Sequence, residues 1–344
     1  MASSSCSGTS ISNVDRFVLC VTPDVPFQTL DLQSCSHEVN SLWLPLGKDK
    51  VECFELKDLW DCYERWSALG AGTPILLGNG DALTQYYVPY LSSIQIYTSK
   101  SVAASRNRRE DTDAAEFEFE SSSEDDSGSD ILSRSVSNNS SKAWDAVSLD
   151  SSSDQLSPLP TRNMLGYLYL QYTETLSPWL RVPFTEKITE LAKSHPALMT
   201  LKSVDISPAS WMAVAWYPIY SIPYHQPSEK ELSACFLTYH TLSSSFQDCK
   251  HMYDDIDIAE DISCFEEWEG VGKTSKENKS GFMSLSPFGM AGYKLQEPFW
   301  LGSSSSSESG NTRMSEMYSA ADSWLKQLNA HHHDFNFFTL RAPL

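Results

Sequence analysis

Apolar positions recur at helical spacing in three parts of the chain. One stripe begins at Leu56, with members three and four residues apart, and Gly70 and Gly72 follow as its stop: Leu56, Leu59, Trp60, Tyr63, Trp66. In a shorter helix, Thr185 caps the start and His195 marks the end before a proline, with Ile188, Leu191 and Ala192 facing inward. The clearest stripe lies near the C-terminal end: Met314, Met317, Tyr318, Ala321, Trp324, Leu325, Leu328. The pattern therefore predicts about three helices.

Residues 210–223 are rich in aromatic side chains and carry no charge, which predicts a strand at 211–222 inside a packed sheet. Residues 83–98 suggest two strand segments bent at Pro89. Further strands are expected at 165–172, 199–206, 235–242 and 288–295. The prolines within residues 13–47 favour an extended segment that wraps the domain. Short connections without helical crossovers favour antiparallel pairing, so we expect an α+β domain with a mainly antiparallel sheet.

Composition divides the 344 residues into a domain and its insertions. Residues 101–160 hold seventeen serines and thirteen acidic residues against five basic ones, and residues 248–280 are also acidic. Such segments bury too little apolar surface to fold, so both are predicted to be disordered. We expect a single α+β domain over 13–340, a disordered N-terminus at 1–12 and a Ser-rich loop at 301–312.

The net charge of −20 argues against direct binding to nucleic acid, which needs clustered lysine and arginine. The apolar runs are shorter than the roughly 20 residues that a bilayer span needs, and no secretory signal is visible. The eight cysteines never fall at metal-site or redox-pair spacing. These observations predict a cytoplasmic or nuclear protein without a metal site or a cofactor.

Three short patterns suggest chemistry, and each has a plainer explanation. Gly270–Thr274 resembles the end of a phosphate-binding loop, but Glu267 occupies the position of the first glycine, so a linker is the better interpretation. The Gly70–Gly72 pair lacks a third glycine and follows a helix. In His331–Asp334, adjacent helical residues point about 100° apart and cannot face one metal ion. No GxSxG motif is present.

No sequence pattern assigns a catalytic residue. Asp205 and His240 could still meet a serine in space, because triads need no proximity in sequence. An aromatic set together with His240 could line a cleft for a ligand or partner, although core packing is the expected role for most of it. The members are Trp211, Trp216, Tyr217, Tyr220 and Tyr239.

The acidic tract contains the most specific functional signal. Five serines have an acidic residue three positions downstream, a spacing that suits an acid-directed kinase with a basic substrate pocket. They are Ser121, Ser122, Ser123, Ser127 and Ser151. The plainer alternative is a solubilising segment that matches by composition alone.

Several segments together resemble the plant family known as domain of unknown function 789. They are Ser12–Phe17 with Val21–Pro23, Asp58–Asp61, Gly70–Pro74, Tyr86–Leu91, Ser203–Tyr220, Phe236–Leu242, Ala321–Leu328 and His332–Phe335. The resemblance covers most of the chain outside the insertions. It implies a plant source and one domain interrupted by variable acidic loops, and it brings no activity, cofactor or catalytic residue.

The sequence thus favours a non-enzymatic interaction or regulatory module, tuned by phosphorylation, with protein partners that are basic. The alternative is an enzyme or small-molecule-binding protein that uses an aromatic-lined cleft of the sheet.

Overall fold

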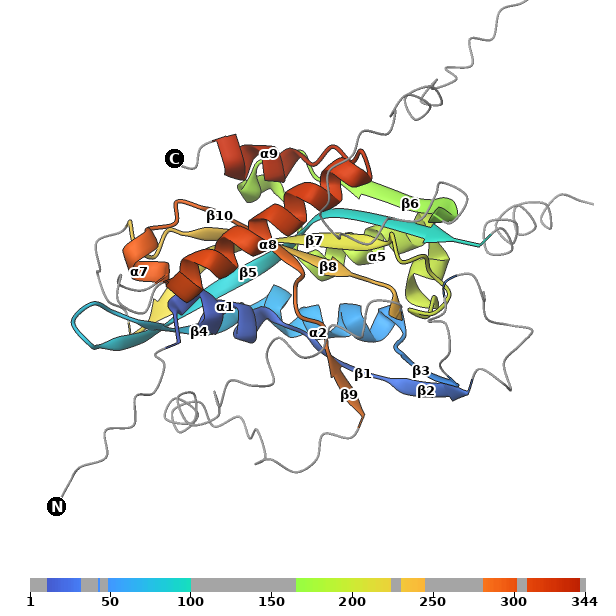
Figure 1. Cartoon of the computed structure of the whole chain (residues 1–344), viewed down its shortest axis with the longest axis horizontal. Coiled ribbons are helices and arrows are strands. Elements are labelled where there is room, and N and C mark those ends of the chain that lie inside the picture. Colours follow the sequence, from blue (N-terminus) through green and yellow to red (C-terminus); the bar gives the residue numbers. More distant parts are fainter. Residues whose placement is uncertain are drawn as a thin grey trace, which may run out of the picture. The chain divides into compact units, whose positions relative to one another are not determined.

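The computed structural model describes residues 11–31, 43, 49–99, 165–223, 230–244, 281–301 and 308–340. The two predicted insertions, at 101–160 and 248–280, lie outside these residues, as does most of the predicted N-terminal segment. The described residues are built around one curled antiparallel sheet with helices on both faces (Figure 1). The α+β class expected from the sequence is confirmed.

Six strands form this sheet in the order β10-β8-β7-β5-β4, with β6 also paired to β5. Their bounds are β4 Ala71–Leu76, β5 Ala82–Thr98, β6 Tyr167–Thr173, β7 Trp211–Ile222, β8 Cys235–Thr241 and β10 Gly289–Tyr293. All pairs are antiparallel. The strands predicted at 165–172, 235–242 and 288–295 are confirmed, and the aromatic strand begins at Trp211 as expected.

Residues 83–98 do not divide into two strands, because β5 runs through Pro89 without a break. On one side β5 pairs with β7 over nearly its whole length. On the other side it pairs with β4 as far as Tyr87 and with β6 from Ser93 onward. Pro89 lies between these two pairings, so its missing N–H leaves no ladder hydrogen bond unmade on that side.

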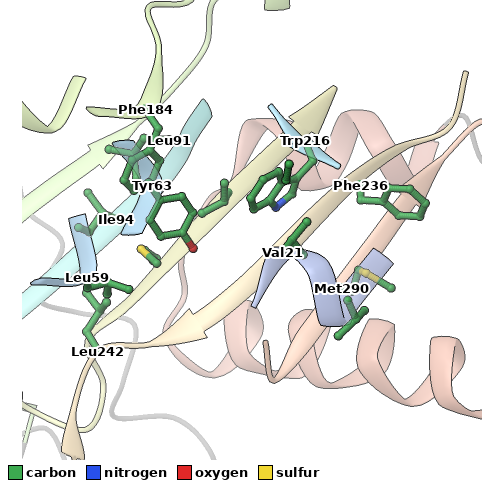
Figure 2. Packing of buried hydrophobic residues seen from close by; sticks show 14 of the residues in the cluster. Val21, Leu59, Tyr63, Leu91, Ile94, Phe184, Trp216, Phe236, Leu242 and Met290 are labelled. Atoms are coloured by element: carbon green, nitrogen blue, oxygen red, sulfur yellow. The ribbon is translucent and has the colours of Figure 1, made fainter. Parts of the chain in front are cut away.

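Four helices pack against the first face of the sheet: α1 Asn13–Val21, α2 Leu56–Leu69, α5 Phe184–Ser194 and α7 Glu297–Leu301. Their apolar side chains meet Met212, Val214 and Trp216 of β7 in the first core. Tyr63 of α2 stacks on Phe184 of α5 with ring centroids 4.2 Å apart (Figure 2). The chain leaves α2 through Gly70, whose φ of +83° favours glycine, as predicted for the helix stop.

The expectation that residues 13–47 are extended was wrong for their first part. Ser12 caps α1 by accepting a hydrogen bond from the Asp15 N–H, and Val14, Phe17, Val18 and Val21 share its buried face. The prolines that suggested extended chain all follow the end of this helix, so they leave it intact.

Two helices cover the second face: α8 Glu308–Gln327 and α9 His333–Leu340. They pack on Trp211, Ala213 and Ala215, which alternate along β7 with the residues of the first core. In Figure 1, α8 runs across the strands of the sheet. Gly289 lets α8 approach closely, because a Cβ there would lie 2.9 Å from the Cβ of Ala321.

The described residues contain six α-helices instead of about three, because α1, α7 and α9 were not predicted. The start of α8 at Glu308 also falls inside the loop expected at 301–312. Within the part of the chain that the structure describes, no helix is long and apolar enough to span a bilayer.

Short elements complete the fold. Strand β1 (Asp24–Pro26) pairs with β9 (Phe282–Ser284), and β2 (Gln28–Asp31) pairs with β3 (Lys50–Cys53). Two 3₁₀ turns are η1 (Pro178–Leu180) and η2 (Pro196–Met199). The strand expected at 199–206 was wrong: this segment makes only isolated bridges to Glu55 and Thr98, because turns interrupt it.

Candidate functional site

The aromatic residues proposed as ligand or partner candidates lie at different depths and on both faces of the sheet. Trp211 and Tyr239 pack in the second core, and Trp216 packs in the first. All three are buried. Tyr217 is half-buried, while Tyr220 is exposed and stacks on Tyr86. Only Tyr217 and Tyr220 of this set therefore reach the surface.

His240, the last of these candidates, is buried in the sheet with both ring nitrogens occupied. Its Nδ1 lies 3.1 Å from the Leu285 carbonyl oxygen, and its Nε2 lies 3.0 Å from Oγ1 of Thr238. Trp216 donates its indole N–H to the same Thr238 oxygen. Burial lowers the pKa of His240 to about 4, so the ring is neutral at pH 7. Neither nitrogen contacts Asp205, which instead accepts from the backbone N–H of Lys202.

Five polar side chains from separate parts of the chain meet beneath α9, and we call them the α9 network. Ser92 comes from β5, Tyr239 from β8, and Arg181 from the loop before α5. His332 directly precedes α9, and Asp334 lies in its first turn. All five are buried, with Ser92 at 0% exposure and Arg181 at 8%.

The hydrogen bonds of the α9 network form one continuous chain. The Tyr239 hydroxyl lies 2.7 Å from Nδ1 of His332, whose Nε2 lies 2.8 Å from Oγ of Ser92. Ser92 donates to Oδ2 of Asp334 at 2.5 Å. Arg181 completes the chain with two bonds of 2.7 Å to the two carboxylate oxygens of Asp334. This bidentate geometry is the strongest form of an arginine–carboxylate pair.

Burial and the ion pair set the charges within the network. Burial lowers the pKa of His332 to about 4, which keeps its ring neutral at pH 7. Burial alone would raise the pKa of Asp334, but Arg181 and the Ser92 hydroxyl outweigh it and lower the pKa. For Arg181, burial acts to lower the pKa, and the bonds to Asp334 outweigh that effect and raise it. The network thus contains one cation, one anion and a neutral imidazole.

These charges fix the direction of every hydrogen bond. Ser92 gives its proton to Asp334, so its oxygen accepts from the Nε2–H of His332. The other ring nitrogen then accepts from the Tyr239 hydroxyl. Arg181 also donates its Nε–H to the Leu176 carbonyl oxygen at 2.9 Å. Each side chain of the network thus has at least one hydrogen-bond partner, which a stable buried polar network requires.

Serine, histidine and aspartate also form hydrolytic triads, but the connectivity here is different. In a triad the carboxylate holds the imidazole nitrogen that lies away from the serine. Here that nitrogen contacts Tyr239, and Asp334 contacts Ser92 itself. Because Ser92 is fully buried, a substrate has no access to its hydroxyl. The geometry is suited to holding α9 on the sheet.

A cavity of about 50 Å³ lies at the start of α2, and no residue of the α9 network lines it. Its walls are Pro26, Phe27, Gln28, Cys53, Phe54, Glu55, Asp58 and Lys202. Pockets for organic ligands are typically about 300–1,000 Å³, so this volume suits water molecules instead.

The consecutive histidines diverge, although His331 and His332 lie outside the helix whose geometry was expected to separate them. His332 points into the network, while His331 and His333 are exposed. His331 and His332 lie between α8 and α9, and His333 is the first residue of α9. Within the described ranges, no group of three or more His, Cys, Asp or Glu residues could hold a metal ion.

The phosphorylation candidates Ser121, Ser122, Ser123, Ser127 and Ser151 lie outside the described residues. The α9 network escaped the sequence analysis, because Ser92 and Asp334 are 242 positions apart. One signal could have found part of it. His332 and Asp334 are followed by Phe335 and Phe338, and in a helix Asp334, Phe335 and Phe338 share one face.

Comparison with known proteins gives one match. A family model described as "Protein of unknown function (DUF789)" matches residues 12–338. Neither a curated protein nor a solved structure matches the chain.

Proposed function

Because the chain belongs to the DUF789 family, whose description assigns no activity, we propose from its own chemistry that it is a non-enzymatic interaction or regulatory module. One observation supports this most: Ser92, His240 and His332, the best-placed candidates for catalytic chemistry, are enclosed in hydrogen-bonded clusters, while large apolar side chains stand on the surface. Ser92, His240 and His332 are at most 2% exposed, whereas Trp179 is 81% exposed. Exposed apolar side chains are what a protein partner can bury.

The proposal includes tuning by phosphorylation in residues 101–160. Phosphates on Ser121, Ser122, Ser123 and Ser127 would each add roughly −1.5 to −2 charges, or about −6 to −8 in total. The unmodified segment has a net charge of −8, from five bases and thirteen acids. Phosphorylation would therefore nearly double its charge and strengthen its attraction for basic partners. The proposed location is the cytoplasm or nucleus of a plant cell, where an acid-directed kinase can act.

The test is affinity purification of the native protein, intact-mass measurement, and titration of the purified partner. We expect phosphates in residues 101–160. Changing Ser121, Ser122, Ser123 and Ser127 together to alanine should weaken binding to the partner, most strongly at low salt, because exposed charges are screened within about 8 Å at physiological ionic strength. Absence of phosphate in this segment, or affinity unchanged by the four substitutions, would contradict the tuning.

The alternative, an enzyme or small-molecule binder, predicts a different result. A metabolite screen by thermal shift should then find a compound that raises the melting temperature of the wild-type protein. The gain should shrink when Tyr217, the half-buried aromatic beside Arg181, is changed to alanine. Such a compound, together with failure to recover any protein partner, would replace the interaction proposal.

A further inference from the structure

We propose that Leu176, Trp179 and Leu180 form a preformed docking knob, which inserts into an apolar pocket on the basic surface of a partner protein. This inference rests on the proposed function and names the surface that performs it. The knob lies in the loop between β6 and α5, residues 174–183.

The three apolar side chains of the knob are among the most exposed of their kind in the described residues. Trp179 is 81% exposed, Leu180 61% and Leu176 48%. All three lie within five consecutive residues of one loop. Tryptophan is the residue type most enriched among those that dominate the energetics of protein interfaces.

Buried charge fixes the start of the loop. Glu174 is 4% exposed, and one carboxylate oxygen accepts the backbone N–H groups of Thr175 and Leu176, each at 2.9 Å. The other oxygen accepts the Tyr172 hydroxyl at 2.7 Å. Burial would raise the pKa of Glu174, but these donors outweigh it and lower the pKa, so the carboxylate stays charged. The chain therefore turns at Leu176 in one defined direction.

The end of the loop is fixed by the α9 network. Arg181 is held by Asp334 and donates its Nε–H to the Leu176 carbonyl oxygen, which closes the loop across its base. Between these anchors, η1 turns the chain with Leu180 N–H donating to the Ser177 carbonyl oxygen at 2.9 Å. Pro178 restricts the backbone of the same turn. Trp179 is thus exposed at the tip of a braced turn.

This arrangement lowers the entropy cost of binding. Ordering a flexible loop opposes association, whereas a loop already held in its bound shape avoids that cost. A partner buries an exposed indole most completely in a concave apolar pocket, so such a pocket is the complement of Trp179. The net charge of −20 favours basic surroundings for that pocket and opposes docking on an anionic lipid surface.

The experiment begins with photo-crosslinking of the full chain in cells of its source organism. The photoreactive analogue p-benzoylphenylalanine replaces Trp179 in one variant and Leu69 in a matched control. Leu69 is 58% exposed at the end of α2, so both positions face solvent. We expect a protein adduct of discrete mass from position 179 and none of that mass from position 69.

The crosslinked protein is then purified and titrated with wild type, Trp179→Ala and Leu69→Ala. We expect Trp179→Ala to weaken binding about tenfold or more, and Leu69→Ala to change it less than about twofold. Because the tryptophan contact is apolar, its fold-loss should be the same at low and high salt, while overall affinity falls with salt. Melting temperatures should not change, since both side chains are exposed.

Three results would overturn the knob: lipid adducts alone at position 179, no discrete protein adduct there, or affinity that Trp179→Ala leaves unchanged. If a partner recovered by affinity purification binds Trp179→Ala as well as wild type, the knob fails and the interaction proposal survives. If a small molecule is found and no partner is recovered, the proposed function itself fails.

Discussion

Replacing Arg181 with methionine leaves the buried carboxylate of Asp334 without its cation. The methionine fills much of the same space, so the main change is electrostatic. Removing one partner of a buried ion pair typically costs about 3–5 kcal/mol, because the other charge remains buried and uncompensated. Asp334 is 2% exposed and bonded to Arg181 through both oxygens, so we expect Arg181→Met to fall within this range.

The assay is equilibrium unfolding in urea, monitored by circular dichroism, in a double-mutant cycle with Asp334→Asn. The amide keeps the shape of the carboxylate and can still accept from Ser92, but it carries no charge. Because neither charge then remains, the double variant should be at least about 2 kcal/mol more stable than the sum of the single effects predicts. Limited proteolysis should show α9 cleaved first in Arg181→Met.

Two outcomes would refute this reasoning. If Arg181→Met costs less than about 1 kcal/mol, water reaches Asp334 and the network does not hold α9 on the sheet. If the two substitutions are additive, the two residues stabilise the fold independently and the ion pair is incidental.

Two further predictions concern acid and packing. In the folded protein, His240 and His332 have pKa values of about 4, against an ordinary value of 6.5, so between pH 6.5 and pH 4 the unfolded chain binds more protons and the free energy of unfolding falls as pH falls. Urea unfolding at pH 7 and at pH 5 should show a loss of roughly 2 kcal/mol for each histidine. A free energy of unfolding that is the same at both pH values would contradict the burial of the two rings in their neutral form. Gly289→Ala places a Cβ 2.9 Å from the Cβ of Ala321 and 3.1 Å from the Met317 carbonyl oxygen, so α8 must shift. We expect the free energy of unfolding in urea to fall by about 1–3 kcal/mol. An unchanged free energy of unfolding would mean that α8 moves freely on β10.

Local patterns were enough to predict the elements whose residues carry strong periodicity. The aromatic strand β7 has apolar side chains on both faces because it lies between two cores, and α2 has a single stripe that meets the first core. The start of α1 was missed because the prolines after Val21 dominated the interpretation of the whole segment. Strand β5 tolerates Pro89 because its pairing with β4 ends before this residue and its pairing with β6 begins after it. This arrangement belongs to the sheet and is not visible in the local sequence.

The candidate sites were harder to predict than the fold. The rings of Trp211, Trp216 and Tyr239 gave the expected signal of core packing. The α9 network gave almost none, since its members come from four segments and each is an ordinary polar residue in its own context. The braced loop at Trp179 depends on a partner of Arg181 that lies 153 positions away. Local windows of sequence do not contain such contacts.

The span of these contacts also bears on how the protein is made. Asn13 donates to the carbonyl oxygens of Leu76 and Phe299, and Ser92 bonds to Asp334, so residues synthesised early wait for partners that are synthesised much later. A chain terminated prematurely after α8 would contain every strand of the sheet. It would nevertheless present Trp211 and Tyr239 to solvent and leave the charge of Arg181 unmatched. Such a product should be recognised by chaperones and degraded.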